Sequence, residues 1–197
     1  MIRAVIFDIG GVMAHLDDRA LLATWPSLGV DRQGLYDAMY AGNDATALIG
    51  RVSAEVWWRG TVASRLRIDD HQLERFLSDL GSNWHWDEQL LAVLRSFTGR
   101  YRTAFLTNAW SDMRELMRAR GVLDAAEVLI NSAEVGVAKP EERIFRIALE
   151  QLQVEPSEAL FVDDVEANAM AARTLGMTAI LHRSTQETLR RLDDVLS

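Results

Sequence analysis

The chain has 197 residues, of which 49% are apolar and 25% charged, and its formal net charge is −8. This length and composition are typical of one medium globular domain, or of a core domain that carries an insertion. The acidic balance argues against sequence-independent binding to nucleic acid or to an anionic membrane, because both need clustered Lys and Arg. The absence of cysteine excludes disulfides, thiolate metal sites and cysteine nucleophiles.

The N-terminal segment reaches a charged residue, Asp8, too soon for the apolar region of a signal peptide. No later stretch is long enough and free enough of charge to span a bilayer. We therefore expect a cytoplasmic protein.

Short continuous apolar runs in the sequence are typical of strands buried on both faces of a parallel sheet. Helical patterns lie between and after these runs, and alternating strands and helices imply right-handed crossovers. The sequence therefore predicts an α/β fold with a Rossmann-like, doubly wound parallel sheet. The expected strands are 4–7, 103–106, 159–162 and 178–181, with 128–130 as a weaker fifth, and the expected helices are 111–121, where Ser111 is the cap, 140–152, where Pro140 is the first residue, 167–175 and 186–196.

The segment 15–86 breaks this alternation. It contains helical patterns at 19–25, 34–40, 53–66 and 71–80, and no convincing strand. We interpret it as a helical cap inserted after the first strand, which leaves residues 1–14 and 87–197 as the core. Five of the six tryptophans lie in this segment, where we expect them to pack inside the cap, with one or two available to a substrate pocket.

Polar and glycine residues follow the predicted strands at their carboxyl ends, where open parallel sheets bind ligands. Three carboxylates brought together there need a cation or a shared proton, and their oxygens suit Mg²⁺. A carboxylate can also act as a nucleophile and form an acyl phosphate, while a lysine neutralises charge. The residues are Asp8 with Gly10 and Gly11 after the first strand, Thr107 and Asn108 after the second, Lys139 before a helix, and Asp163 with Asp164.

With these motifs, the chain resembles the haloacid dehalogenase-like hydrolase superfamily, specifically its members with a helical cap after the first strand. The four motifs of that superfamily are matched in order by FDIGGV (7–12), FLTN (105–108), KP (139–140) and FVDD (161–164). Each motif alone is weak evidence, but the four in order, each at a strand end, form a specific pattern.

The resemblance implies a role for each matching residue. Asp8 would be the nucleophile and a metal ligand, and the carbonyl of Gly10 would also bind the metal. Thr107 and Asn108, together with Lys139 and Gly11, would hold the phosphoryl group, and Lys139 would also pair with Asp8. Asp164 would bind Mg²⁺ directly, and Asp163 directly or through water.

One position departs from the pattern of the superfamily's phosphatases. Most of them carry a second Asp two residues after the nucleophile, as general acid and base, and this chain has Gly10 there. Loss of such a group typically lowers the rate by about 10²–10⁴-fold. His15, Asp17 and Asp18 are possible substitutes from the segment that leads into the cap.

The leading hypothesis is a Mg²⁺-dependent phosphatase of a small phosphorylated metabolite, with an aspartyl-phosphate intermediate on Asp8. One alternative is a 2-haloacid dehalogenase-type enzyme, which also lacks the second Asp but holds no metal at motif four. Another is a binding or regulatory protein that lost turnover with Gly10. A receiver domain is discounted because its acidic pair comes early in the chain and no long helical insertion follows. The sequence indicates neither the substrate nor the oligomeric state.

Overall fold

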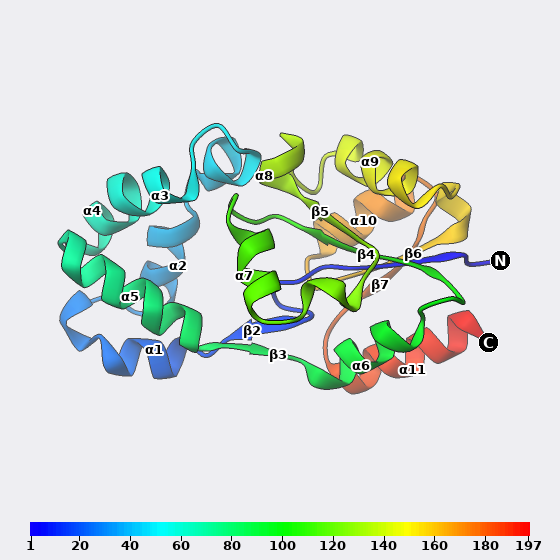
Figure 1. Cartoon of the computed structure of the whole chain (residues 1–197), viewed down its shortest axis with the longest axis horizontal. Helices are drawn as coiled ribbons and strands as arrows, with labels where there is room; N and C mark the ends of the chain where they lie inside the picture. Colours follow the sequence, from blue (N-terminus) through cyan, green and yellow to red (C-terminus); the bar gives the residue numbers. More distant parts are fainter.

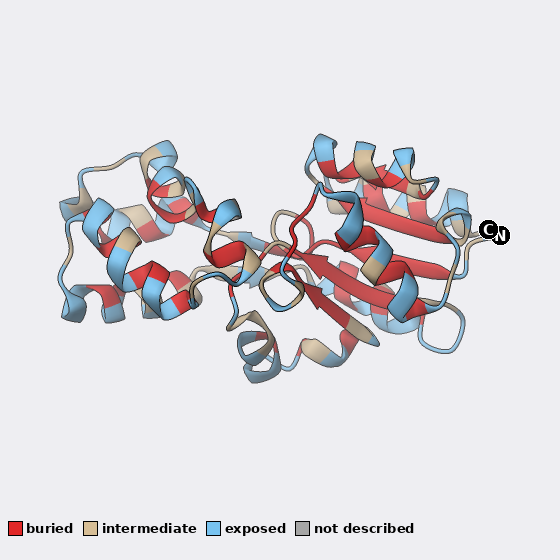
Figure 2. Cartoon of the chain, turned by 90° about the horizontal axis from the view of Figure 1, so that it is seen from above, coloured by how far each residue is buried: buried red, intermediate tan, exposed pale blue. Residues whose placement is uncertain are grey.

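The computed structural model describes residues 1–197, apart from the side chain of Asp44. It has a larger part built on a sheet and a smaller helical part, joined by two short strands (Figure 1). Buried residues run along the whole sheet and along the inward faces of the surrounding helices (Figure 2). None of the helices in the described chain is long and apolar enough to cross a membrane.

The sheet of the larger part has five parallel strands in the order β5-β4-β1-β6-β7. In the central strand β1, Ile6 lies between Ala104 of β4 and Phe161 of β6. This order places β1 in the middle and confirms the predicted α/β fold with a doubly wound parallel sheet. The strands are β1 (Ala4–Phe7), β4 (Arg102–Thr107), β5 (Val128–Asn131), β6 (Ala159–Asp163) and β7 (Thr178–Leu181).

Helices cover both faces of the sheet because alternate residues of each buried strand point to opposite sides. Val5 and Phe7 pack in one apolar cluster with residues of α6, α7 and α11, whereas Ile6 packs in a second cluster with α9 and α10. The helices of this part are α6 (Glu88–Ser96), α7 (Met113–Ala119), α8 (Ser132–Val135), α9 (Glu142–Leu152), α10 (Glu166–Thr174) and α11 (Thr185–Leu196), with short 3₁₀ turns η5 (Leu123–Ala125) and η6 (Pro156–Glu158).

The helical part, here called the cap, has an apolar cluster of its own, to which one residue outside the cap, Trp110, is added. Four tryptophans of the cap pack in or against this cluster, as expected for an insertion that buries its own core. The elements are α1 (Asp18–Thr24), η1 (Pro26–Leu28), α2 (Arg32–Tyr40), η2 (Asn43–Ala45), η3 (Ala47–Ile49), α3 (Ala54–Trp57), the π-helical turn η4 (Trp58–Val62), α4 (Ala63–Leu66) and α5 (Asp70–Ser82).

The expectation that segment 15–86 holds no strand is wrong at its two ends. β2 (Ala14–Leu16) and β3 (Trp84–Trp86) pair in an antiparallel ribbon in which His15 lies opposite His85. Each strand has only three residues, too few to establish an alternating pattern in the sequence. The ribbon forms through pairing between distant segments, and it is the double connection between the cap and the sheet.

The two helix starts predicted from a named residue, Ser111 as a cap and Pro140 as a first residue, also differ from the structure. Ser111 does not cap α7, whose N-cap is Asp112; its Oγ instead accepts a hydrogen bond of 3.3 Å from the Ala54 N–H of the cap. Helix α9 begins at Glu142 rather than at Pro140. Ser111 is bonded to the cap, and Pro140 lies in a turn in which the Glu141 N–H donates to the Ala138 carbonyl at 3.0 Å, so each boundary shifts by one or two residues.

A glycine brings the cap against the larger part at one point. Gly50 follows η3 with φ of +71°, and a Cβ on it would lie 2.2 Å from the carbonyl oxygen of Ala133 in α8. Only glycine permits both the left-handed backbone and this approach. A second contact joins the parts where Arg120 donates to the carbonyl of Gly81 at 2.6 Å.

Candidate active site

The ends of β1 and β6 bring two carboxylates and a lysine together. Because Phe7 pairs with Val162, the next residues, Asp8 and Asp163, emerge side by side. The Lys139 Nζ lies 2.7 Å from Asp8 Oδ1 and 2.7 Å from Asp163 Oδ2. Lys139 is 5% exposed, Asp8 6% and Asp163 0%, so both ion pairs are shielded from solvent.

The carboxylate of Asp163 has further partners on α10. Its Oδ1 accepts from the Val165 N–H at 2.8 Å, and the Asn168 amide donates to both of its oxygens at 3.0 and 3.1 Å. Buried carboxylates are stable only when their lone pairs are occupied in this way. Asp163 is therefore held in one orientation, and it in turn fixes Lys139 against Asp8.

The charges of the cluster shift the protonation of its members. Burial raises the pKa of Asp8 to about 7; the Lys139 ammonium opposes that rise and the Asp163 carboxylate adds to it. Burial by itself lowers the pKa of Lys139, but Asp8 and Asp163 outweigh burial and raise it. Lys139 thus stays charged, whereas Asp8 needs additional positive charge to be fully ionised at neutral pH.

A third carboxylate completes an acidic group. Asp8, Asp163 and Asp164 each offer an oxygen within 4.8 Å of the others. Burial and the neighbouring Asp163 raise the pKa of Asp164, so the group disfavours a third negative charge without a cation. In the described chain no hydrogen bond reaches the Gly10 carbonyl, which leaves that oxygen available. Such a set of hard oxygen donors fits Mg²⁺.

The two glycines after Asp8 have different surroundings. Gly11 has φ of +77°, and a Cβ on it would lie 2.3 Å from Oδ2 of Asp164. A side chain at Gly11 would therefore displace a carboxylate of the acidic group. A Cβ on Gly10 would meet nothing within 4 Å, so the space beside this position is open.

Thr107 and Asn108 lie at the end of β4, the neighbour of β1. Thr107 is 3% exposed. The Asn108 amide donates to the Lys139 carbonyl at 2.9 Å, and its oxygen accepts from the Lys139 N–H at 2.8 Å. The side chain of Asn108 thus positions the segment that carries Lys139. Its phosphate-binding role stays a prediction, for which the second amide hydrogen and the backbone N–H are the groups on offer.

The three candidates for a substitute acid differ in what they contact. Asp17 caps α1 by accepting from Ala20 N–H at 2.9 Å, and Asp18 pairs with Arg32 at 2.7 Å, so both have structural partners. His15 is exposed on β2, with its ring centroid 6.3 Å from that of His182.

Two residues beside the site are absent from the sequence-based expectations. The backbone N–H of His182 donates to the Asp163 carbonyl at 2.8 Å, and the ring Nδ1 of His182 lies 2.8 Å from Thr188 Oγ1. Its signal in the sequence is its position directly after the strand 178–181. Trp110 comes two residues after Asn108 and packs into the cap, and its proximity to a motif is its only signal.

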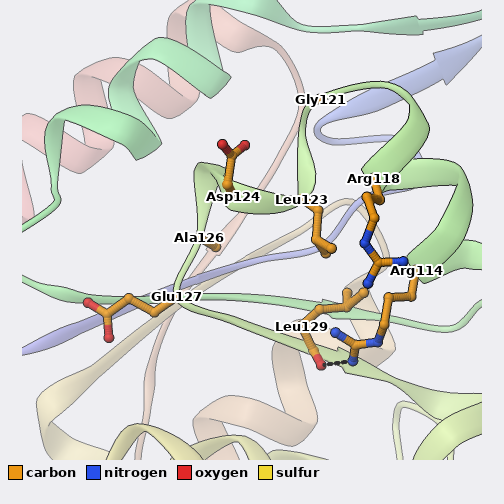
Figure 3. Close-up of a pocket in the computed structure, with 8 residues that line it drawn as sticks. All are labelled: Arg114, Arg118, Gly121, Leu123, Asp124, Ala126, Glu127 and Leu129. Atoms are coloured by element: carbon orange, nitrogen blue, oxygen red, sulfur yellow. Dashed lines mark hydrogen bonds between the residues drawn. The ribbon is translucent and has the colours of Figure 1, made fainter.

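A separate surface pocket lies over the edge strand β5, away from the acidic group. Figure 3 shows Arg114 reaching across it to donate to the Leu129 carbonyl at 3.1 Å, and the same side chain pairs with Glu134. No member of the acidic group is among the residues that line it, so the pocket is separate from the acidic group. Its lining residues are Arg114, Arg118, Gly121, Leu123, Asp124, Ala126, Glu127 and Leu129.

Residues 2–176 match the family described as haloacid dehalogenase-like hydrolase. The chain belongs to this family. It is therefore a haloacid dehalogenase-like (HAD) hydrolase, and the predicted resemblance is confirmed.

Known proteins give a consistent picture of the HAD fold. The chain is 29% identical over 98% of its length to bifunctional epoxide hydrolase 2 of Sus scrofa, but spans only 39% of that protein. A HAD family enzyme of Bacteroides thetaiotaomicron, in complex with magnesium and inorganic phosphate, has a TM-score of 0.76 and 21% identity, with coverage of 94% of this chain and 96% of that one.

A second solved structure represents a different chemistry on the same fold. The L-2-haloacid dehalogenase of Xanthobacter autotrophicus, with chloropropionic acid covalently bound, has a TM-score of 0.69 and 21% identity. The alignment covers 98% of this chain and 83% of that one. At these identities both structures establish the fold, and the chemistry must be argued from the residues of the site.

Proposed function

We propose that the protein is a Mg²⁺-dependent phosphatase of small phosphate monoesters, acting through an aspartyl-phosphate on Asp8. The observation that supports this most is the pair of 2.7 Å contacts by which Lys139 joins Asp8 to Asp163 beside a third carboxylate, Asp164. The arrangement concentrates a nucleophile, a fixed positive charge and a set of oxygen ligands at one point. Transfer of a phosphoryl group to a carboxylate uses all three.

The proposed roles follow from the contacts of each residue. The Asp8 carboxylate attacks phosphorus, the ester P–O bond breaks and the alcohol leaves, and water then hydrolyses the aspartyl-phosphate to phosphate and free Asp8. The Lys139 ammonium neutralises charge on Asp8 and on the phosphoryl oxygens. The phosphoryl group is held by Thr107, by the second amide hydrogen and the backbone N–H of Asn108, and by the backbone at Gly11. Asp8, Asp164, Asp163 and the Gly10 carbonyl would hold Mg²⁺, which when bound neutralises phosphate and carboxylate charge.

The proposed reaction also assigns a role to each of the two parts of the chain. We propose that residues 1–14 and 87–197 form the catalytic core and that residues 15–86 form a cap over it. The reacting groups come from the ends of β1, β4 and β6 and, for Lys139, from the loop before α9, all within the core, whereas the cap joins the core through the β2–β3 ribbon and through Gly50. In this division the core performs the chemistry and the cap encloses the leaving group.

A dehalogenase is the second candidate because Gly10 carries no acid–base side chain and a dehalogenase shares the fold. The acidic group distinguishes the two. A carboxylate that attacks carbon needs no metal, and three carboxylates within 4.8 Å would then only disfavour the ionised nucleophile. We therefore favour attack on phosphorus.

The test is a panel of phosphate monoesters, and of short 2-haloacids, assayed with Mg²⁺ and with excess chelator. We expect phosphate release from at least one ester, its loss in chelator, its return with Mg²⁺, and no halide release. Asp8→Asn should lower turnover by about 10⁴-fold or more, as removal of a nucleophile does. Asp124→Asn is the matched control, because Asp124 is exposed at the β5 pocket.

Two results would contradict this proposal. Halide release that persists in chelator would assign the protein to the dehalogenase chemistry. Mg²⁺ binding without turnover of any ester would instead support a binding protein that lost catalysis with Gly10.

A further inference from the structure

Trp110 belongs to the core by sequence and to the cap by packing. It follows Thr107 and Asn108 in the loop after β4, yet its ring lies in the apolar cluster of the cap. The ring stacks on Tyr40 with centroids 5.3 Å apart and lies 4.9 Å from the ring of Trp58. The three rings, here called the aromatic wall, join the motif-two loop directly to the cap.

The loop that carries Trp110 is held at each of its residues. Asn108 bonds to the backbone of Lys139, and the Ala109 N–H donates to Ser132 Oγ at 3.1 Å. The Trp110 carbonyl accepts from the Asn131 amide at 2.8 Å, and Ser111 accepts from the cap. The position of the indole is therefore fixed relative to Lys139, and so relative to the reacting carboxylate.

The indole N–H of Trp110 is buried and has no hydrogen-bond partner within the described chain. Two tryptophans of the cap itself differ from Trp110: the Trp57 N–H donates to the Met39 carbonyl at 2.9 Å and the Trp25 N–H to Asp79 at 2.9 Å. A buried unpaired donor destabilises a fold, and in a loop held at four points it is not explained by poor packing. A donor kept free beside a reaction site is suited to a ligand.

The loop between Thr107 and Trp110 is short, so the two residues lie close together. Trp110 comes three positions after Thr107, so their Cα atoms are at most roughly 11 Å apart. Trp58 begins the π-helical turn η4, a conformation that is frequent at functional sites. Tyr40 is the partly exposed ring of the aromatic wall, whereas Trp58 and Trp110 are buried, so the wall meets solvent on the side of Tyr40.

We propose that Trp110, with Tyr40 and Trp58, forms the leaving-group subsite of the proposed phosphatase. The rings contact a flat or apolar leaving group, and the Trp110 N–H donates to an acceptor atom on that group. The preferred substrates are thus phosphate monoesters of aromatic or apolar alcohols that carry a hydrogen-bond acceptor. The inference rests on the proposed function, because it needs a phosphoryl group held at Asp8.

Trp110→Phe tests the subsite, since it keeps a ring and removes the N–H. The assay compares 4-nitrophenyl phosphate, which has an aromatic leaving group with acceptor oxygens, with phenyl phosphate and methyl phosphate. We expect kcat/KM to fall about tenfold for the nitro ester, as for loss of one hydrogen bond, and to change far less for methyl phosphate. The loss should appear mainly in KM.

Trp57→Phe is the matched control, because it removes the same atoms from the same apolar cluster. It removes the 2.9 Å bond to the Met39 carbonyl and leaves that oxygen only the 3.5 Å contact from the Asn43 amide, so it should lower the melting temperature more than Trp110→Phe does. Equal effects of Trp110→Phe on all three esters would overturn the subsite while leaving the phosphatase proposal intact. If the wild-type protein hydrolyses no ester in Mg²⁺, both proposals fail together.

A measurement on the wild-type protein covers the case in which Trp110→Phe does not fold. The chain has six tryptophans, whose indole N–H groups can be followed by ¹⁵N NMR. Addition of 4-nitrobenzylphosphonate in Mg²⁺ should move the Trp110 signal downfield, towards the position of hydrogen-bonded indoles, whereas methylphosphonate should not. If both phosphonates bind and no indole signal moves, Trp110 does not contact the leaving group.

Discussion

The proposed active site has two halves that differ in how many of their bonds the protein itself supplies. In the buried half, Asp8, Lys139, Asp163 and Asn168 are joined by ion pairs and hydrogen bonds between 2.7 and 3.1 Å. In the open half, Gly10 and Gly11 contribute no side chains and Asp164 is only partly buried. The buried half is complete without a ligand, and the open half is not.

The difference indicates what each half does. A carboxylate and an ammonium that are already oriented need little reorganisation when a substrate arrives, which is the main source of electrostatic catalysis. In the proposed mechanism, the open half leaves room for the cation and the phosphoryl group to enter. Its two glycines keep that room. A Cβ on Gly11 would collide with Asp164, and Gly10 places no side chain in the open space beside it.

The largest expected effect comes from breaking the buried half with Lys139→Met. The substitution leaves Asp8 and Asp163 facing each other without a cation, so the pKa of Asp8 should rise above its value of about 7 and reduce the ionised nucleophile at neutral pH. We expect turnover to fall at least about 10³-fold. Unpairing this buried network should also cost about 3–5 kcal/mol of unfolding free energy.

Both quantities are measurable by steady-state kinetics at saturating Mg²⁺ and by denaturant unfolding. Arg118→Met is the control, because it removes an exposed positive charge at the β5 pocket. A Lys139→Met protein with near-normal turnover would show that the buried half is structural rather than catalytic.

A smaller effect is expected in the open half, where Gly11→Ala and Gly10→Ala make the same chemical change at adjacent positions. The Cβ at residue 11 would lie 2.3 Å from Asp164 Oδ2, on a backbone with positive φ, whereas that at residue 10 meets nothing within 4 Å. We expect Gly11→Ala to weaken Mg²⁺ binding about tenfold or more by displacing Asp164, and Gly10→Ala to leave it nearly unchanged. Calorimetric titration with Mg²⁺ measures both affinities.

Equal affinities in the two alanine variants would contradict the comparison of the halves, since they would show that Asp164 need not occupy its present position to bind the metal.

The sequence predicted most of the sheet because its strands are buried on both faces. The runs 4–7 and 178–181 coincide with β1 and β7, since a short continuous apolar run is typical of a strand that helices cover on both faces. The gathering of Asp8 and Asp163 followed from the parallel order, which aligns the carboxyl ends of neighbouring strands. Local pattern and global fold agree at these positions.

Other features depend on contacts between distant segments and leave no local pattern. The three-residue strands β2 and β3 exist only through each other. The role of the Asn108 amide in holding Lys139, 31 positions away, is fixed by the loops rather than by the residue type. Trp110 reads in the sequence as a loop residue of the core, and only packing shows that it belongs to the cap.

The central claim is that Asp8 attacks phosphorus, and rapid acid quenching tests it most directly. The protein is mixed with Mg²⁺ and a hydrolysed ester, quenched within the first turnover, and digested for mass spectrometry. The account predicts one phosphoryl group on the peptide that contains Asp8, and none in Asp8→Asn. Turnover in which that peptide never carries phosphate, or in which another residue carries it, would contradict the account.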